Sequence, residues 1–302
     1  MIRSAVTLNL IETMTQGPWI FWHDLEESLK KSAQLGFDGV ELFTRSGTDL
    51  DANHLKQRLD HYGLQLAAVG TGAGKVLQGL TLTDPDAAIR KKAIDFIAEM
   101  ISFGAQFGAP AIIGSMQGNV LPSGNREETF KLLTEGLEVL GKHAASLGVT
   151  LIYEPLNRYE TNLFNTLEAG SGFLESNSMS NVKLLADLFH MNIEEDSLAD
   201  ALHRDRALRA ERLGEEREAQ LFEHPAGLAD AGLGVGAERQ CAARRGVELD
   251  GLLHLEHPGA VAAEVVREAL DAVDDASQVD DEPGEAGEAR ASDESVVHER
   301  VE

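Results

Sequence analysis

Short apolar runs alternate with longer amphipathic stretches over roughly the first 200 residues of the chain. Six runs contain Val, Ile, Leu and Ala with little polar alternation, which is typical of strands covered on both faces. These predicted strands lie at residues 4–9, 39–43, 64–70, 109–116, 149–154 and 182–187. The spacing of apolar positions between them predicts helices over residues 24–35, 51–62, 86–107 and 127–147. A glycine follows each predicted helix, which favours a left-handed C-cap before the next strand.

This alternation predicts six consecutive right-handed βαβ units. Such units build either an open doubly wound sheet or most of an eight-stranded barrel. An open sheet would require a phosphate-binding glycine motif after the first strand, and residues 11–18 contain none. We interpret the glycine-rich residues 70–74 as a flexible loop at the rim. The sequence therefore predicts an α/β fold of the (β/α)8 TIM-barrel class, with the first six βα units clear and the last two atypical or missing.

The composition changes abruptly near residue 204. Residues 204–302 contain no Lys, Ile, Met, Asn, Thr, Trp or Tyr, although these seven types occur 54 times in residues 1–203. Almost every residue of this tail belongs to an amino-acid type whose codons can begin with G or C. We know of no folding requirement that would restrict the composition of a protein segment in this way. We therefore divide the chain into a barrel domain, 1–203, and an atypical acidic tail rich in Ala, Glu and Arg, 204–302.

Two interpretations of the tail stay open. A GC-rich gene read out of frame, or from the opposite strand, would produce this composition, so one hypothesis is that the native frame is lost between about residues 195 and 209. The other is a genuine Ala-rich extension that is partly disordered, as its acidic final thirty residues suggest. A single clean reading frame through codon 204 in independent sequencing reads would refute the frameshift.

Charge and cysteine content narrow the functional classes. A formal net charge of −25 makes nucleic acid and acidic membranes poor partners. A single cysteine, Cys241, excludes an intrachain disulfide framework and favours a reducing compartment. No signal-peptide pattern opens the chain, and no apolar run approaches the roughly 18 residues that a membrane helix needs. We expect a cytoplasmic protein, and the oligomeric state, a homo-oligomer included, stays open.

Acidic and imidazole side chains follow two of the predicted strands. Residues 153–160 read Tyr-Glu-Pro-Leu-Asn-Arg-Tyr-Glu, and residues 187–195 read Asp-Leu-Phe-His-Met-Asn-Ile-Glu-Glu. Charged groups where a strand leaves the core are unfavourable for stability unless something binds there. If the two strands are neighbours in one parallel sheet, these side chains converge at one rim. That arrangement suits a divalent cation and a polyhydroxylated substrate.

These two motifs, together with Gly-Phe-Asp-Gly-Val-Glu-Leu at residues 36–42, resemble the xylose isomerase-like barrel superfamily. Within it they are most similar to the sugar phosphate isomerase/epimerase branch that includes D-tagatose and D-psicose 3-epimerases, over roughly residues 1–203. The resemblance implies a metal-dependent isomerase or epimerase that acts on a small sugar or sugar phosphate. The implied cofactor is Mn²⁺, Mg²⁺ or Co²⁺, held by two glutamates, an aspartate and a histidine. Glu154 and Asp187 match metal ligands of the family, and Glu160 and His190 match its substrate-contacting residues.

Proton transfer beside a ketose carbonyl requires a base and stabilisation of an enediolate. Glu154 is our candidate base because a carboxylate that reaches both metal and substrate can take that proton. The alternative for Glu154 is a carboxylate exposed to water at the end of a strand, and the alternative for Asp187 is a helix N-cap. The alternative for His190 is a structural histidine whose hydrogen bonds are satisfied within the fold, and the alternative for Glu160 is an ordinary charged residue in a loop. Glu41, at the second strand, either lines the pocket or is a buried structural carboxylate.

The resemblance weakens after residue 203. The family pattern at the seventh strand, His-x-His followed by Asp and Arg, is missing from the tail, and Glu256 is only a weak candidate for the final glutamate ligand. One alternative function is therefore a non-catalytic or truncated remnant of the barrel. Others are a hydroxypyruvate or inositol-derivative isomerase, and a DNA-repair endonuclease of the same superfamily, which the acidic charge disfavours.

Overall fold

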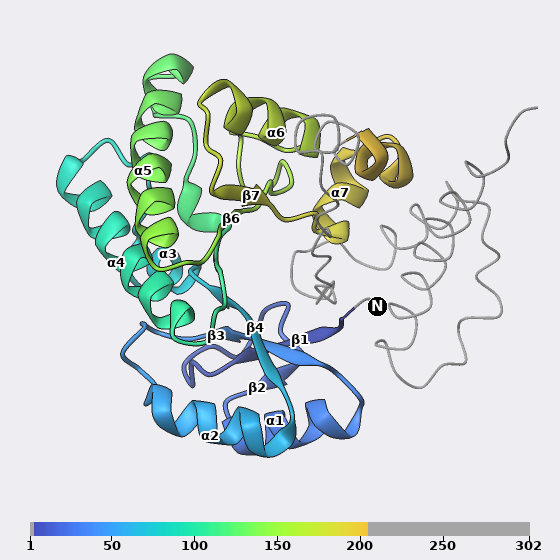
Figure 1. Ribbon diagram of the computed structural model, residues 1–302. Helices are drawn as coiled ribbons and strands as arrows, with labels where there is room; N and C mark the ends of the chain where they lie inside the picture. The colour runs from blue at the N-terminus through green and yellow to red at the C-terminus, as the bar shows by residue number, and fades with distance from the viewer. Residues whose placement is uncertain (1–2, 205–302) are drawn as a thin grey trace, which may run out of the picture.

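The computed structural model describes residues 3–204, so the predicted tail from residue 205 on, the last two barrel units and Glu256 lie outside the described residues. Seven parallel strands form one sheet in the order β2-β1-β3-β4-β5-β6-β7 (Figure 1). Their bounds are β1 Ala5–Asn9, β2 Phe21–Trp22, β3 Gly39–Phe43, β4 Gln65–Gly70, β5 Ala111–Ile113, β6 Leu151–Tyr153 and β7 Val182–Leu184. All six predicted strands are present and each pairs with the next one along the chain, as the βαβ pattern requires.

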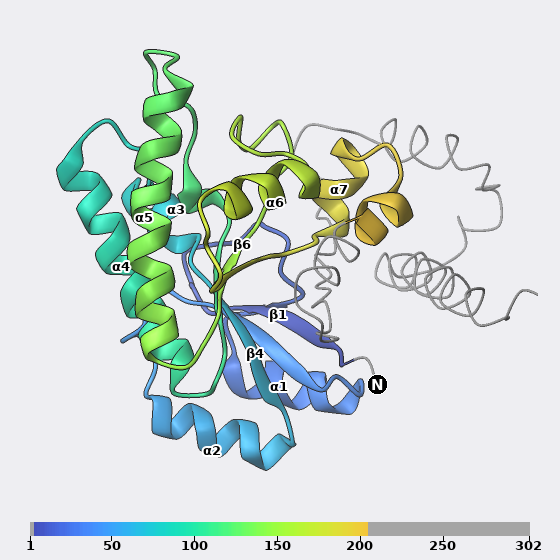
Figure 2. The same cartoon turned by 45° about the horizontal axis from the view of Figure 1, so that its top comes forward.

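Helices connect the strands and lie along one face of the curved sheet (Figures 1 and 2). Their bounds are α1 Leu25–Gln34, α2 Ala52–Tyr62, α3 Ala73–Gln78, α4 Ala87–Ala105, α5 Arg126–Ser146, α6 Leu167–Ser176 and α7 Leu188–Glu194, with a 3-10 turn η1 at Ser115–Gln117. The four predicted helices correspond to α1, α2, α4 and α5. The prediction of a flexible loop at residues 70–74 is wrong in part, because α3 begins at Ala73.

Local chemistry explains where the helices begin and end. Aspartates 24, 51 and 86 and Asn125 each accept a backbone N–H of the first turn of α1, α2, α4 and α5, which satisfies groups that have no partner within the helix. Gly63 ends α2 in the left-handed conformation, at φ 67°, and donates to the carbonyls of Asp60 and Leu59. The predicted helix-to-strand turn is therefore present.

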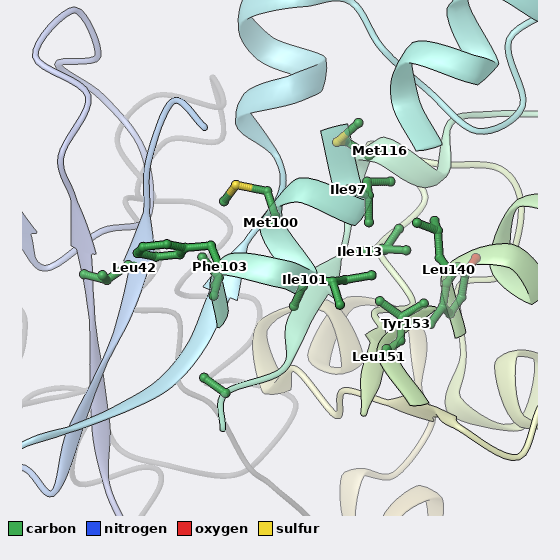
Figure 3. Close-up of a cluster of buried hydrophobic side chains, with 14 of the residues drawn as sticks. Leu42, Ile97, Met100, Ile101, Phe103, Ile113, Met116, Leu140, Leu151 and Tyr153 are labelled. Atoms are coloured by element: carbon green, nitrogen blue, oxygen red, sulfur yellow. The ribbon is translucent and has the colours of Figure 1, made fainter. Parts of the chain in front are cut away.

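Apolar side chains separate into two layers because successive strand residues point to opposite faces. The larger core lies between the sheet and the helices and includes Leu42 of β3, Ile101 of α4 and Leu140 of α5 (Figure 3). On β6, Leu151 and Tyr153 join this core. Residues of the other parity form a small separate cluster on the opposite, inner face, namely Ala68, Ile112, Ile152 and Leu185. The candidate site lies next to this inner cluster, on the same face of the sheet.

None of the helices in residues 3–204 is long and apolar enough to span a bilayer.

Candidate active site

The two strand-end motifs converge as predicted. β6 and β7 are parallel neighbours, with Tyr153 in register with Leu184, so the residues that follow both strands emerge at the same edge of the sheet. Glu154 comes directly after β6, and Asp187 is the N-cap of α7. Each lies two positions beyond a member of the inner apolar cluster and therefore points to the same inner face. The equivalent positions at the end of β4 and directly after β5 are glycines, Gly70 and Gly114.

The Glu154 carboxylate is buried, with 6% of the residue exposed, which excludes the alternative of a solvated strand-end charge. Gly114 makes room for it, since a Cβ on Gly114 would lie 2.4 Å from Glu154 Oε2. The buried Gln117 side chain fixes the backbone on both sides by donating from Nε2 to the carbonyls of Gly114, at 3.0 Å, and Glu154, at 2.9 Å. Among the described residues, no protein N–H or hydroxyl group donates to Glu154 Oε1.

Asp187 is both a helix N-cap and a member of the site. Its Oδ1 atom accepts the backbone N–H of Phe189 at 2.7 Å and that of His190 at 3.3 Å. Its Oδ2 atom lies 4.0 Å from His190 Nε2, and only 1% of the residue is exposed. The helix cap therefore holds one carboxylate oxygen and directs the other into the site.

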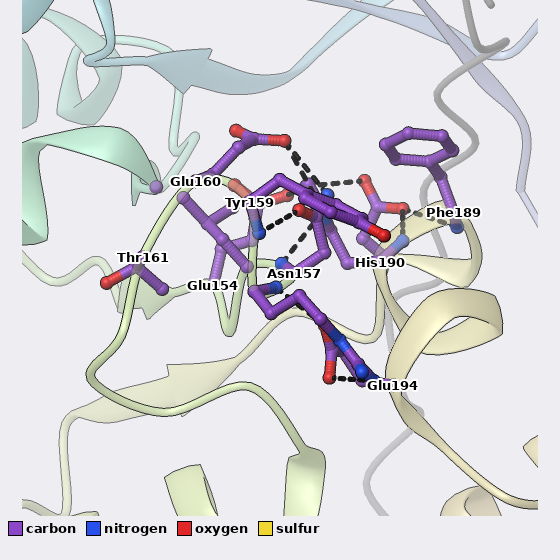
Figure 4. A network of polar contacts seen from close by, with 12 residues as sticks. Glu154, Asn157, Tyr159, Glu160, Thr161, Phe189, His190 and Glu194 are labelled. Atoms are coloured by element: carbon purple, nitrogen blue, oxygen red, sulfur yellow. Dashed lines mark hydrogen bonds and ion pairs between the residues drawn. The ribbon is translucent and has the colours of Figure 1, made fainter. Parts of the chain in front are cut away.

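His190 faces the carboxylates with one edge and the β6 motif with the other (Figure 4). Its Nε2 atom lies 3.8 Å from Glu154 Oε1. Its Nδ1 atom is 2.8 Å from Asn157 Nδ2 and also accepts the Asn157 backbone N–H at 3.2 Å. Glu160 stands at the rim with its side chain 44% exposed, 3.8 Å from His190 Nδ1, and accepts from Asn157 Nδ2 at 3.0 Å. All four predicted site residues thus lie in one group.

Burial raises the pKa of Glu154 well above its ordinary value, and the negative charges of Asp187 and Glu41 raise this pKa further. Glu41, at 5% exposed on β3, is the third buried carboxylate of this inner face. Concentrated acidic groups in a low-dielectric environment favour a bound proton or cation. Glu41 is therefore a buried carboxylate, as one alternative predicted, and its negative charge also acts on the site.

Three supporting residues were missed in the sequence. Gly114 and Gln117 follow β5 and carried no recognisable pattern, although a glycine two positions beyond the buried strand residue Ile112 could have suggested space for a neighbouring side chain. Asn157 lies inside the motif at residues 153–160 but had no assigned role. A nearby acidic residue, Glu194, ends α7 and accepts from the Arg158 backbone N–H at 2.6 Å, which joins the helix to the β6 motif.

Glu154, Asp187 and His190 form a group that could hold a metal ion, with one donor atom of each residue within 4.8 Å of the others. All three residues are buried. The two carboxylates of this group fit a divalent cation of the Mg²⁺ or Mn²⁺ type, for which carboxylate oxygens are preferred ligands. The Glu154 Oε1 atom, buried without a protein donor among the described residues, is the atom that such a cation would satisfy.

Fold and site together define a TIM-barrel protein with a buried acidic centre at the carboxyl ends of its strands. Residues 29–272 match the family described as Xylose isomerase-like TIM barrel, and because this is more than half of the chain, the chain belongs to that family. The predicted fold class and family are confirmed.

Curated relatives of the chain are sugar epimerases. L-ribulose 3-epimerase of Mesorhizobium japonicum is 29% identical over 59% of this chain and 60% of the relative. D-psicose 3-epimerase of Agrobacterium fabrum is 30% identical over 58% of this chain and 61% of the relative. 3-dehydro-D-guloside 4-epimerase of Escherichia coli K12 is 28% identical over 64% of this chain and 75% of the relative. The chain spans about three fifths of the length of the first two relatives.

Solved structures agree with the fold. D-psicose 3-epimerase from Clostridium cellulolyticum H10, crystallised with D-tagatose, is 25% identical, with a TM-score of 0.52 over 68% of this chain and 70% of that chain. A structure of L-ribulose 3-epimerase has a TM-score of 0.63 over 95% of this chain and 100% of that chain. At 18% identity the second structure supports the fold alone.

Proposed function

We propose that the barrel is a metal-dependent epimerase or isomerase of a small sugar or sugar phosphate, and specifically of the ketose 3-epimerase type. The observation that carries the proposal is the buried Glu154–Asp187 pair at neighbouring strand ends, with His190 beside it. The named relatives, among them L-ribulose and D-psicose 3-epimerases, support the same chemistry. On this proposal the partner is a small-molecule sugar.

Glu154 is the proposed base that removes the proton from the carbon next to the ketose carbonyl. A carboxylate is an effective base near neutral pH when its pKa is raised toward that range, and burial and the charges of Asp187 and Glu41 raise the pKa of Glu154. Removal of this proton leaves an enediolate, and return of a proton to the opposite face gives the epimer. Gly114 and Gln117 hold the Glu154 carboxylate and its backbone in place for this transfer.

A divalent cation, Mn²⁺, Mg²⁺ or Co²⁺, would be held by Glu154 and Asp187 and would supply electrophilic stabilisation of the negative charge that develops on the substrate oxygen. Asp187 suits the role of a fixed ligand because the α7 N-terminus holds its Oδ1 atom. His190 and Glu160 are the proposed substrate contacts. The imidazole faces the carboxylates, while the more exposed Glu160 at the rim can accept substrate hydroxyl groups.

The family resemblance implies four metal ligands, and of these the described residues supply Glu154 and Asp187. This observation favours a second interpretation, in which the chain is a truncated, non-catalytic remnant because the remaining ligands belong to the sequence after residue 203. If the chain is an enzyme, the finer alternatives are a hydroxypyruvate or inositol-derivative isomerase, and profiling candidate substrates with metal present separates them.

The deciding experiment is a metal titration combined with proton exchange at the sugar carbon in deuterated water. The wild type is expected to bind Mn²⁺ and to incorporate deuterium next to the carbonyl of a ketose. Glu154→Gln should lower the exchange rate by about 10²-fold or more. Asp187→Asn should weaken metal binding while the helix remains capped, since Asn is an equally good N-cap.

Glu135→Gln is the matched control, because Glu135 lies on the exposed face of α5 and its ion pair with Lys131 is long, at 4.0 Å. If this chain neither binds metal nor exchanges protons, but a frame-restored version does both, the remnant interpretation is correct for this chain and the site assignment stands. If the restored version also lacks metal, the assignment of Glu154 and Asp187 is wrong.

A further inference from the structure

The Asn157 side chain has one orientation that satisfies all of its contacts. Its Oδ1 atom accepts the Tyr159 backbone N–H at 3.0 Å, so the other terminal atom of the amide is the nitrogen. This Nδ2 group lies 3.0 Å from Glu160 Oε1 and 2.8 Å from His190 Nδ1. Asn157 is 2% exposed, so these contacts are shielded from water.

His190 Nδ1 therefore faces two N–H groups of the same residue. The Asn157 backbone N–H donates to it at 3.2 Å and the Nδ2 group reaches it at 2.8 Å (Figure 4). A nitrogen that accepts hydrogen bonds must present its lone pair, and in a neutral imidazole the proton then resides on the other nitrogen. The opposite nitrogen, Nε2, points to Glu154 Oε1 at 3.8 Å and Asp187 Oδ2 at 4.0 Å.

We propose that Asn157 is a positioning residue that fixes His190 in the tautomer with the proton on Nε2 and directs this N–H toward the carboxylate pair. A histidine that binds a cation through Nε2 needs a lone pair on that atom and usually carries a proton on Nδ1. Asn157 stabilises the reverse arrangement. His190 is therefore a hydrogen-bond donor in this site, while the two carboxylates provide the oxygen ligands.

The distances agree with this division of roles. At 3.8 and 4.0 Å, His190 Nε2 is too far from either carboxylate oxygen for a direct hydrogen bond. Glu160 extends the same network to the rim, because it shares the Asn157 Nδ2 group with His190. The role of His190 as a hydrogen-bond donor to substrate rests on the proposed sugar chemistry, whereas the assignment of its tautomer does not.

The test is the ring ¹⁵N–¹H correlation pattern of His190 in the ¹⁵N-labelled full-length chain, assigned by its loss in His190→Gln. The wild type is expected to show the proton on Nε2 and an unprotonated Nδ1. Asn157→Asp keeps an acceptor for the Tyr159 N–H but turns an oxygen toward His190, so Nδ1 should gain a proton. Asn53→Asp introduces the same charge on exposed α2 and should leave the pattern unchanged.

A wild-type spectrum with the His190 proton on Nδ1 would overturn the inference even if Asn157→Asp fails to fold. An unchanged pattern in a folded Asn157→Asp would also overturn it. Metal titration adds a second readout: His190→Gln should bind Mn²⁺ within about 2-fold of the wild type, and a loss of 10-fold or more would contradict the proposed division of roles. If no sugar exchanges protons but the tautomer is as expected, the proposed function fails and the role of Asn157 stands.

Discussion

Replacement of Gly114 by alanine tests whether the space beside Glu154 sets the geometry of the site. The new Cβ would lie 2.4 Å from Glu154 Oε2, whereas an ordinary contact begins near 3.4 Å. The carboxylate oxygen must therefore move by about 1 Å within the buried group that also contains Asp187 and His190. Because the displaced atom is the end of a flexible side chain, we expect a stability loss of only about 1 kcal/mol, the low end for overpacking.

The effect on the site should be much larger than the effect on stability. A 1 Å displacement of a reacting group can lower the rate by about 10²-fold. Urea unfolding, Mn²⁺ titration and deuterium exchange are measured together on Gly114→Ala and on Gly172→Ala. Gly172 lies exposed on α6, and among the described residues no atom outside its own stretch of helix is within 4 Å of the position that a Cβ would take there. Its variant should therefore match or exceed wild-type stability and leave the site unchanged. Wild-type metal affinity and exchange in Gly114→Ala would refute the reasoning.

Three further predictions concern the same region. Gln117→Leu removes the acceptor of the buried Tyr153 hydroxyl and two donations to backbone carbonyls, so it should lower the free energy of unfolding by about 3 kcal/mol in urea titrations; a loss below 1 kcal/mol would contradict this. The raised pKa of Glu154 means that the folded state favours the protonated carboxyl group. The stability of the folded state relative to the unfolded state is therefore highest below the unfolded pKa of 4.5, and it falls as the pH rises through the folded pKa. In EDTA, Glu154→Gln should therefore equal the wild type in stability near pH 4 and exceed it near pH 8, and the opposite trend would show that the carboxylate is not destabilised by burial. Arg158→Met should change the urea midpoint little, because the guanidinium is 58% exposed and Glu194 still accepts the backbone N–H of residue 158; a large drop in the midpoint would contradict this.

The strands and the main helices could be predicted because their signals are local. The β6 and β7 segments are apolar runs, and their parallel pairing follows from the βαβ alternation, so the meeting of Glu154 with Asp187 was predictable before any coordinates. The N-cap role of Asp187 was predicted only as a rival to its site role. The structure shows that one carboxylate does both, since its two oxygens point in different directions.

The rest depends on contacts between segments that are distant in the sequence. β2 consists of two aromatic residues, Phe21 and Trp22, which a strand pattern cannot distinguish from a packed loop. The helix that begins at Ala73 forms despite Gly74 in its first turn because the backbone packs closely there, with Gly74 against Met116. Gln117 acts on Glu154 across 37 residues of sequence, and such a contact leaves no periodic signal.

Anomalous diffraction from crystals grown with Mn²⁺ locates the bound cation without reference to activity. A single strong peak is predicted between the Glu154 and Asp187 carboxylates, at about 2.0–2.6 Å from an oxygen of each, with His190 Nε2 outside the coordination shell. A peak bound through His190 Nε2, or no peak at these two carboxylates while Mn²⁺ binds elsewhere on the protein, would show that Glu154 and Asp187 are not the metal site.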